Sequence, residues 1–291
     1  MATTKKKRAV SKAKKTPAKT AAPVTETALT KTPEKEVVKR AAVRHAKVDL
    51  FVWNKWLAII YAIQGIALIV VSGSKSLPVF STYLTKSTLP DNGMVHATQR
   101  LFDANIVALV VGMFFVAAIA HALLAGVCRS RYEAELAEGT NRLHWLTFGA
   151  SSLFLLVIVS LLTGISDVAA LCMISALSIG QSIFAYLAAG QKTAVRQSYA
   201  ISMGASVVVW LAILFTAVSA AIYGTHVASF MYGVYATAVI GFAAQAAVTY
   251  AAVNKKGKWA NAYYAELSYA LVALITVSAV AWQVFAGALR P

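Results

Sequence analysis

The residues best suited to chemistry in this chain are a few polar side chains that interrupt long apolar runs. His121 and Glu266 are ionisable, and Gln64 is an amide that can donate and accept hydrogen bonds. An ionisable group in an apolar run is a candidate for function because it is costly to bury, and a histidine can carry protons near neutral pH. Each has a structural alternative. His121 can be a hydrogen-bonded cavity histidine, Glu266 can pair with a nearby cation or interfacial water, and Gln64 can join two helices.

The sequence lacks the patterns of known catalytic and metal sites. It contains no H-E-x-x-H, C-x-x-C or G-x-S-x-G motif, no glycine-rich phosphate loop and no pair of carboxylates within an apolar run. We therefore predict that the protein is not an enzyme and holds no metal. An ion pump would carry several acidic groups along its path, and a single glutamate does not supply them.

These polar residues stand in a chain with the composition of a membrane protein. Of its 291 residues 59% are hydrophobic, and the mean hydropathy is +0.66. A helix needs about 20 apolar residues to cross the hydrocarbon layer, and its backbone groups must bond within the segment. The sequence therefore predicts an all-α, multi-pass protein of the cell membrane, a bundle of seven transmembrane helices. The predicted helices are 51–72, 104–127, 144–165, 168–189, 199–223, 227–253 and 262–289.

Loop charges predict the orientation of this bundle. With the N-terminus inside, the inside loops hold eight lysines and arginines, and the outside segments hold four. Because positive residues concentrate on the cytoplasmic side, we expect a cytoplasmic N-terminus and an external C-terminus. The long outside segment 73–100 contains S-L-P-V-F-S-T-Y-L-T, whose β-branched and aromatic residues can form a short hairpin.

The N-terminal segment differs from the rest in composition. Residues 1–47 are rich in Lys, Ala, Thr and Pro, and the first 50 residues hold fourteen basic and four acidic side chains. Such a segment cannot bury a core, so we expect a disordered basic cytoplasmic tail, 1–47, and a membrane domain, 48–291. Three roles stay open for the tail. It can bind anionic lipid or an acidic partner, serve topology and solubility, or bind nucleic acid, which the lack of interleaved aromatic residues disfavours.

Landmarks in the last run, 257–289, resemble the seventh helix of heliorhodopsins. That family has G-x-W, a Glu, a Tyr three residues later and finally A-W-Q-V-F-x-G. The counterparts here are Gly257, Trp259, Glu266, Tyr269 and residues 281–287. Further matches are Asn54, Gln64, Gly65 and Ser72 in the first run, with His121, Trp145 and Trp210 in later ones. The resemblance covers about residues 50–291 and implies a rhodopsin-like bundle with the inverted topology.

The same resemblance locates several departures from the family pattern. Val277 stands where the family carries the lysine that forms the retinal Schiff base, and Thr147 replaces the glutamate counterion. Ala273 replaces a serine one turn before the lysine position, Tyr61 replaces a histidine and His144 an arginine. The isopropyl group of Val277 cannot form an imine. Without the lysine's positive charge, a buried glutamate would destabilise the protein by about 3–5 kcal/mol. The loss of the glutamate is therefore consistent with the loss of the lysine. We predict that no retinal is bound covalently.

The resemblance also implies a role. We expect a non-pumping sensory or regulatory protein of the lipid bilayer that forms homodimers. A cavity between the third, fifth, sixth and seventh helices would admit a small apolar ligand, including retinal held without a covalent bond. Its aromatic candidates are Trp145, Trp210 and Trp282. The alternative is a membrane scaffold that recruits an acidic partner or anionic lipid through the basic tail.

Overall fold

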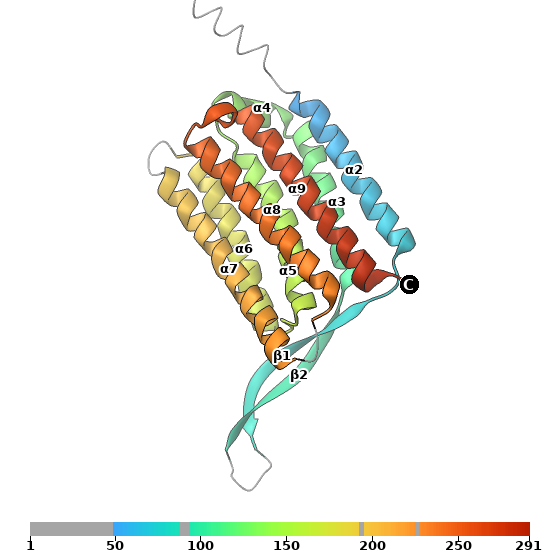
Figure 1. Cartoon of the computed structure of the whole chain (residues 1–291). Helices are drawn as coiled ribbons and strands as arrows, with labels where there is room; N and C mark the ends of the chain where they lie inside the picture. Colours follow the sequence, from blue (N-terminus) through green and yellow to red (C-terminus); the bar gives the residue numbers. More distant parts are fainter. Residues whose placement is uncertain (1–48, 88–92, 192–194, 225–226) are drawn as a thin grey trace, which may run out of the picture. The chain divides into compact units, whose positions relative to one another are not determined.

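A computed structural model describes residues 49–87, 93–191, 195–224 and 227–291 (Figure 1). The predicted tail, 1–47, lies outside these residues. Within them, seven helices are long and apolar enough to cross a membrane. They are α2 (Leu50–Val71), α3 (Ile106–Ala125), α5 (Arg142–Thr163), α6 (Val168–Ala189), α7 (Val195–Tyr223), α8 (Ser229–Val253) and α9 (Ala262–Val284), the last extended by a π-helical turn, η2 (Phe285–Leu289). Each matches a predicted run to within about four residues, which confirms the prediction of seven helices.

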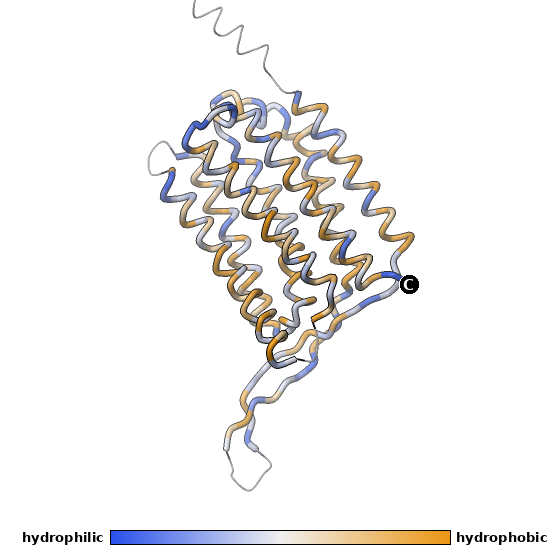
Figure 2. Tube along the Cα trace, viewed as in Figure 1, coloured by the Kyte–Doolittle hydropathy of each residue, from blue (hydrophilic) through white to orange (hydrophobic). Residues whose placement is uncertain are grey.

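The outward faces of these helices are apolar. Figure 2 shows hydrophobic residues along the helices and hydrophilic residues mainly toward the ends of the bundle and on the hairpin. Large apolar side chains such as Val70, Phe215 and Ile240 are 77%, 76% and 67% exposed. In water a surface of this kind would promote association, whereas in a bilayer it meets hydrocarbon. The surface therefore requires a lipid environment.

The helices pack around one main core. Leu57, Phe114, Leu156, Ile213 and Val280 come from five different spans and are almost completely buried together. Small residues let neighbouring helices approach closely, as is usual in membranes. This packing fixes the spans relative to one another.

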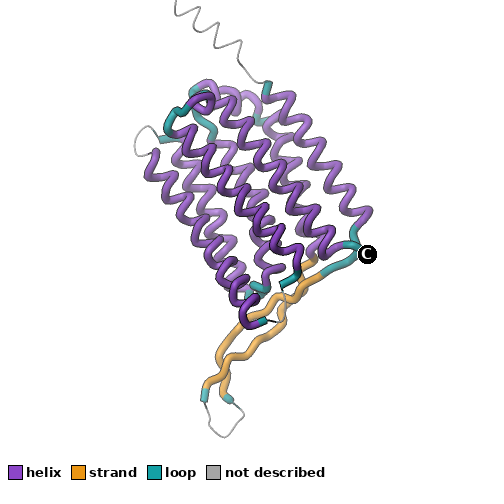
Figure 3. Tube along the Cα trace, in the orientation of Figure 1, coloured by secondary structure: helices purple, strands orange, loops and turns teal. Residues whose placement is uncertain are grey.

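A two-stranded antiparallel sheet joins α2 to α3 (Figure 3). Its strands are β1 (Ser76–Lys86) and β2 (Met94–Asn105). The predicted hairpin is confirmed, although its second strand continues to Asn105, beyond the predicted end at residue 100. Asn105 ends the strand and begins the helix, because its side chain accepts a hydrogen bond from Ala108 N at 2.9 Å and caps α3.

Asp167 ties the hairpin to the bundle. Its Oδ1 accepts hydrogen bonds from Ala169 N at 2.9 Å and Ala170 N at 3.1 Å, and so caps α6. Its Oδ2 accepts a hydrogen bond from Thr82 N on β1 at 3.0 Å. The hydrogen bonds from Ala170 and then from Thr82 lower the pKa of Asp167, since they favour the charged carboxylate more than desolvation opposes it.

Acidification should loosen this junction. The folded-state pKa of Asp167 lies below its unfolded value of about 3.9, so its contribution to stability is present above that value and is lost as the pH falls through the folded-state pKa. Asparagine caps helices about as well as aspartate but does not titrate, so Asp167→Asn is the matched control. Between about pH 6 and about pH 3 we expect the melting temperature to fall further for the natural chain than for Asp167→Asn. An equal fall would contradict a role for the carboxylate.

Helix α4 (Arg129–Ala137) is a short element that the apolar pattern does not predict. It lies at the end of the bundle opposite the hairpin (Figure 1). Its outer surface carries the pair Arg131–Glu135, with 3.1 Å between Nε and Oε1, at the spacing of four residues that supports short helices. Its inner surface buries Tyr132. The helix thus brings a loop residue up to the membrane-spanning bundle.

Candidate functional site

A cavity lies inside the bundle among α2, α3, α5, α8 and α9. The volume open to the centres of water molecules is about 40 Å³, which is room for about three waters at roughly 10–15 Å³ each. Pockets for drug-sized ligands measure about 300–1,000 Å³, so a polyene fits only if side chains move. The polar lining residues are Tyr61, His121, His144, Thr147, Ser151, Ser152, Gln245 and Thr276.

The two positions on which the prediction of no covalently bound retinal depends both line this cavity. Val277 on α9 is 5% exposed, and Thr147 projects from α5. The Thr147 hydroxyl donates a hydrogen bond to His144 O at 2.8 Å, so it is satisfied within its own helix. None of the described residues that line the cavity is a lysine, an aspartate or a glutamate. The cavity therefore offers neither an amine nor a carboxylate.

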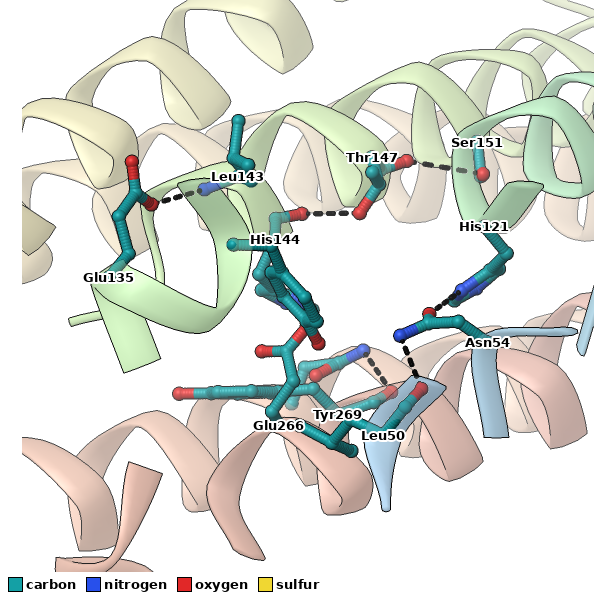
Figure 4. A network of polar contacts seen from close by, with 12 residues as sticks. Leu50, Asn54, His121, Glu135, Leu143, His144, Thr147, Ser151, Glu266 and Tyr269 are labelled. Atoms are coloured by element: carbon teal, nitrogen blue, oxygen red, sulfur yellow. Dashed lines mark hydrogen bonds and ion pairs between the residues drawn. The ribbon is translucent and has the colours of Figure 1, made fainter. Parts of the chain in front are cut away.

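His121 links the first two spans. Its Nδ1 lies 2.7 Å from Oδ1 of Asn54, and Asn54 Nδ2 donates to Leu50 O at 2.8 Å (Figure 4). The His121 ring stacks on Tyr61, with 5.6 Å between centroids and 11° between planes. Both rings line the cavity. These contacts give His121 the surroundings of a hydrogen-bonded cavity histidine.

Glu266 lies beside the cavity, is 3% exposed, and has no lysine or arginine within ion-pair distance in the described part of the chain. Its Oε1 accepts a hydrogen bond from the Tyr132 hydroxyl at 3.0 Å. The same oxygen lies 3.6 Å from Nδ1 of His144, and Figure 4 shows Glu266 beside His144. Burial and then the charge of Glu266 raise the pKa of Tyr132, so its phenol stays protonated and donates. The carboxyl group is thus enclosed by α4 and α5, whereas the two structural alternatives were a nearby cation and interfacial water.

Buried polar atoms around His144 have unused hydrogen-bonding capacity. Nε2 of His144, Oε2 of Glu266 and Oε1 of Gln245 have no partner among the described residues. The His144 ring stacks on Tyr269 with 4.4 Å between centroids, and Gln245 Nε2 donates to Tyr269 O at 3.2 Å. Buried polar atoms are normally satisfied by protein or water. Since His144 and Gln245 line the cavity, their free atoms are suited to holding water or a small polar ligand there.

Aromatic rings close the cavity on the side of α7. Phe242 makes edge-to-face contacts with Phe148 and with Trp210, with centroids 5.8 Å and 5.4 Å apart. Phe148 and Phe242 line the cavity, and Trp210 of α7 stands behind them. The expected position between the third, fifth, sixth and seventh spans is therefore wrong in part. The fifth span, α7, supplies no lining residue, whereas the first two spans, α2 and α3, do.

The other predicted residues lie in different surroundings. Ala273 lines the cavity. Trp145 is buried outside the lining, with its ring edge-on to His144 at 5.1 Å. Trp282 lies at the surface, where its Nε1 donates to Gln64 Oε1 at 3.0 Å and joins α9 to α2. Gln64 therefore joins two helices, as its structural interpretation from the sequence predicts.

The contacts that link Tyr132, Glu266, His144, Tyr269 and Gln245 form a polar network beside the cavity. Two of its members, Tyr132 and Gln245, are not among the predicted residues. Gln245 is an amide inside a predicted helix, so the criterion that selects Gln64 would also select it. Tyr132 carries no such signal because it stands in a polar segment between two spans. Its place beside Glu266 depends on the folding of α4.

Over the part of the chain that the structure describes, the fold and the cavity define an integral membrane protein with seven spans and an internal site between them. The heliorhodopsin family model matches residues 50–289, and the chain belongs to the heliorhodopsin family. The match includes all seven spans and the positions of Thr147 and Val277. No curated protein matches the chain.

Proposed function

We propose that this heliorhodopsin-family protein binds no retinal covalently, pumps no ions and acts as a sensory or regulatory protein in the membrane. The observation that supports the proposal is the presence of Val277 and Thr147 on the lining of one cavity that holds neither amine nor carboxylate. A protonated Schiff base needs the amine that forms it and a negative group nearby. Glu266 is the buried acidic residue of the described spans, and one such group does not form an ion path.

The ligand that the cavity favours is small and polar rather than an intact polyene. The cavity's volume of about 40 Å³ is enough for a few water-sized groups. Nε2 of His144 and Oε1 of Gln245 supply free polar atoms at its wall. Both retinal held without a covalent bond and a larger apolar ligand would require side chains of the lining to move.

The contacts also suggest how occupancy would be passed on. His144 lines the cavity, and its Nδ1 lies 3.6 Å from Oε1 of Glu266. This oxygen in turn accepts the hydrogen bond of the Tyr132 hydroxyl on α4. A ligand that bonds to His144 changes the environment of this carboxyl group. The change would then reach α4 at the end of the bundle, where a partner protein has access to it.

Addition of all-trans-retinal to the purified chain tests the proposal. We expect the absorption of free retinal and no visible band that hydroxylamine removes, because no cavity residue can form an imine. The matched positive control is Val277→Lys with Thr147→Glu, which supplies the amine and the carboxylate in the same scaffold. A hydroxylamine-sensitive band from the natural chain would overturn the proposal.

Orientation and assembly belong to the same proposal. The excess of basic residues on one set of loops, eight against four, supports a cytoplasmic N-terminus in the cell membrane. The family resemblance supports a homodimer. Epitope tags on the two ends, detected on intact and on permeabilised cells, test the orientation.

A second candidate function rests on the charge of the first 50 residues, fourteen basic against four acidic side chains. In this function the protein is a membrane scaffold whose tail recruits anionic lipid or an acidic partner, since each basic residue near an anionic surface contributes about 1 kcal/mol. Deletion of residues 1–47 separates the two functions. Loss of partner recruitment with an unchanged melting temperature favours the scaffold.

A further inference from the structure

A larger cavity opens at the end of the bundle that carries α4. Its volume is about 550 Å³, within the range of sites for small molecules. We call it the basic cleft, because its lining includes the cations Arg142 and Lys255 against one carboxylate, Glu138. Trp259, from the 3₁₀ turn η1 (Gly257–Ala260), adds an aromatic wall. The charges and the aromatic surface suit an anionic ligand with an apolar part.

Arg142 presents an uncompensated charge to the basic cleft. It is the first residue of α5, and its guanidinium lies against Gly190, where a Cβ would come within 2.4 Å of Arg142 Cζ. Its Nη2 donates a long hydrogen bond of 3.4 Å to Gly190 O. Unlike Arg129 and Arg131, it has no carboxylate partner among the described residues. Its remaining donors are free to bind an anion.

Lys255 reaches the cleft from a turn that would favour glycine. Its φ of 52° is in the left-handed region. The turn closes α8, with Lys255 N donating to Ala252 O at 3.1 Å and Lys256 N to Ala251 O at 2.8 Å. Glycine is preferred at this position because it has no Cβ. A lysine here is strained, and strain of this kind is typical of functional positions.

An apolar groove adjoins the basic cleft on the membrane-facing side of the bundle. It lies between α7 and α8 and has a volume of about 430 Å³. Tyr199 and Val253 line both the groove and the cleft. The groove is lined mainly by apolar surface, and Arg196, near the start of α7, also lies on it. A third cation therefore lines the groove, one helical turn before Tyr199, which the groove shares with the cleft.

We propose that the basic cleft and the groove together bind one anionic phospholipid. Its phosphate lies among Arg142, Lys255 and Arg196, and an acyl chain lies in the groove between α7 and α8. All three cations stand at ends of membrane spans, the depth at which lipid phosphates are found. This lipid site is distinct from the inner cavity and from the basic tail. It borders the polar network, because Tyr269 lines the cleft and stacks on His144.

Binding of short-chain lipids to the full chain in neutral detergent, measured by native mass spectrometry, tests the proposal. We expect phosphatidylglycerol to bind more tightly than phosphatidylcholine. Lys255→Gly should weaken phosphatidylglycerol binding about fivefold, equivalent to about 1 kcal/mol for one cation. Its melting temperature should stay equal or rise, because glycine relieves the positive φ. A weaker affinity would therefore not reflect unfolding.

Two further variants make the test specific. Lys55→Ala removes the same charge from α2, at a residue that lines neither the cleft nor the groove, and should change binding by less than Lys255→Gly. Ala200→Trp fills the groove and should weaken lipid binding while leaving the binding of glycerol phosphate, which has no acyl chain, unchanged. Any contribution of the basic tail is the same in every variant.

Each remaining outcome counts against the lipid site. Equal affinity for phosphatidylcholine and phosphatidylglycerol would exclude recognition of the charge. Equal effects of Lys255→Gly and Lys55→Ala would show that lipid is attracted by the overall positive charge and not by the cleft. Glycerol phosphate that binds as tightly as the lipid would make the cleft a site for a soluble phosphate compound instead.

Discussion

Val277→Lys should destabilise the bundle by about 3–5 kcal/mol, the cost typical of an unpaired charge in a protein interior. Val277 is 5% exposed, and the described residues that line its cavity include no carboxylate. The cavity of about 40 Å³ also leaves little water to solvate an ammonium group. Val277→Met is the matched control, because methionine is unbranched and uncharged and packs adaptably. We expect it to cost about 1–3 kcal/mol, the range for a larger apolar side chain in a packed core, and less than Val277→Lys.

Thr147→Glu completes a double-mutant cycle with this substitution. Alone, it places an unpaired carboxylate in the same cavity and should also be strongly destabilising. Combined with Val277→Lys, it supplies the missing partner, so the double variant should be more stable than the sum of the single effects by about 1–3 kcal/mol. Thermal unfolding in detergent measures each step. Strictly additive losses would show that the two positions do not face each other across the cavity.

Tyr132→Phe should cost about 2–3 kcal/mol, although it removes a single oxygen from a loop helix. The hydroxyl donates to Oε1 of Glu266 at 3.0 Å, and Oε2 of the same carboxyl group already lacks a partner. The variant leaves the buried carboxyl group with its contact to His144 Nδ1 at 3.6 Å but without the phenol's hydrogen bond. A buried acceptor that is left without a hydrogen bond destabilises the fold by its full desolvation penalty, and this penalty is larger for charged groups.

Two variants separate this effect from a general weakening of α4. Tyr186→Phe removes a hydroxyl that accepts a hydrogen bond from Arg131 at 3.0 Å on the exposed side, and should cost less than about 0.5 kcal/mol. Tyr132→Phe combined with Glu266→Met removes donor and acceptor together, and should recover most of the loss. If the double variant is no more stable than Tyr132→Phe alone, the hydrogen bond is not the cause.

The seven spans follow directly from the sequence. Each is an apolar run long enough to cross a bilayer, and lipid leaves a helix as the structure such a run can form. The hairpin also follows from its β-branched and aromatic residues, with its end at Asn105 set by a helix cap that the pattern alone does not mark. The positions of Val277 and Thr147 follow from the family pattern, and the structure places both on one cavity.

The parts that the sequence does not predict depend on contacts between distant segments. The Tyr132–Glu266 hydrogen bond joins residues 134 positions apart, and the segment around Tyr132 is too polar and short to stand out as a helix. The extent of the cavity depends on how Phe148, Phe242 and Trp210 stack, which is a matter of packing rather than of residue type. Glu266 is recognisable as a buried acid, but its partners are not.

The most direct test of the central claim is the mass of the protein and of its peptides after retinal and then borohydride are added. Borohydride reduces an imine to a stable amine, so any Schiff base would remain on the chain as a retinyl group. We predict that one equivalent of retinal leaves no retinyl group on a peptide of the spans of the natural chain, because no lysine lines the cavity that holds Val277. A mass increased by one retinyl group on a residue within the spans would contradict the account.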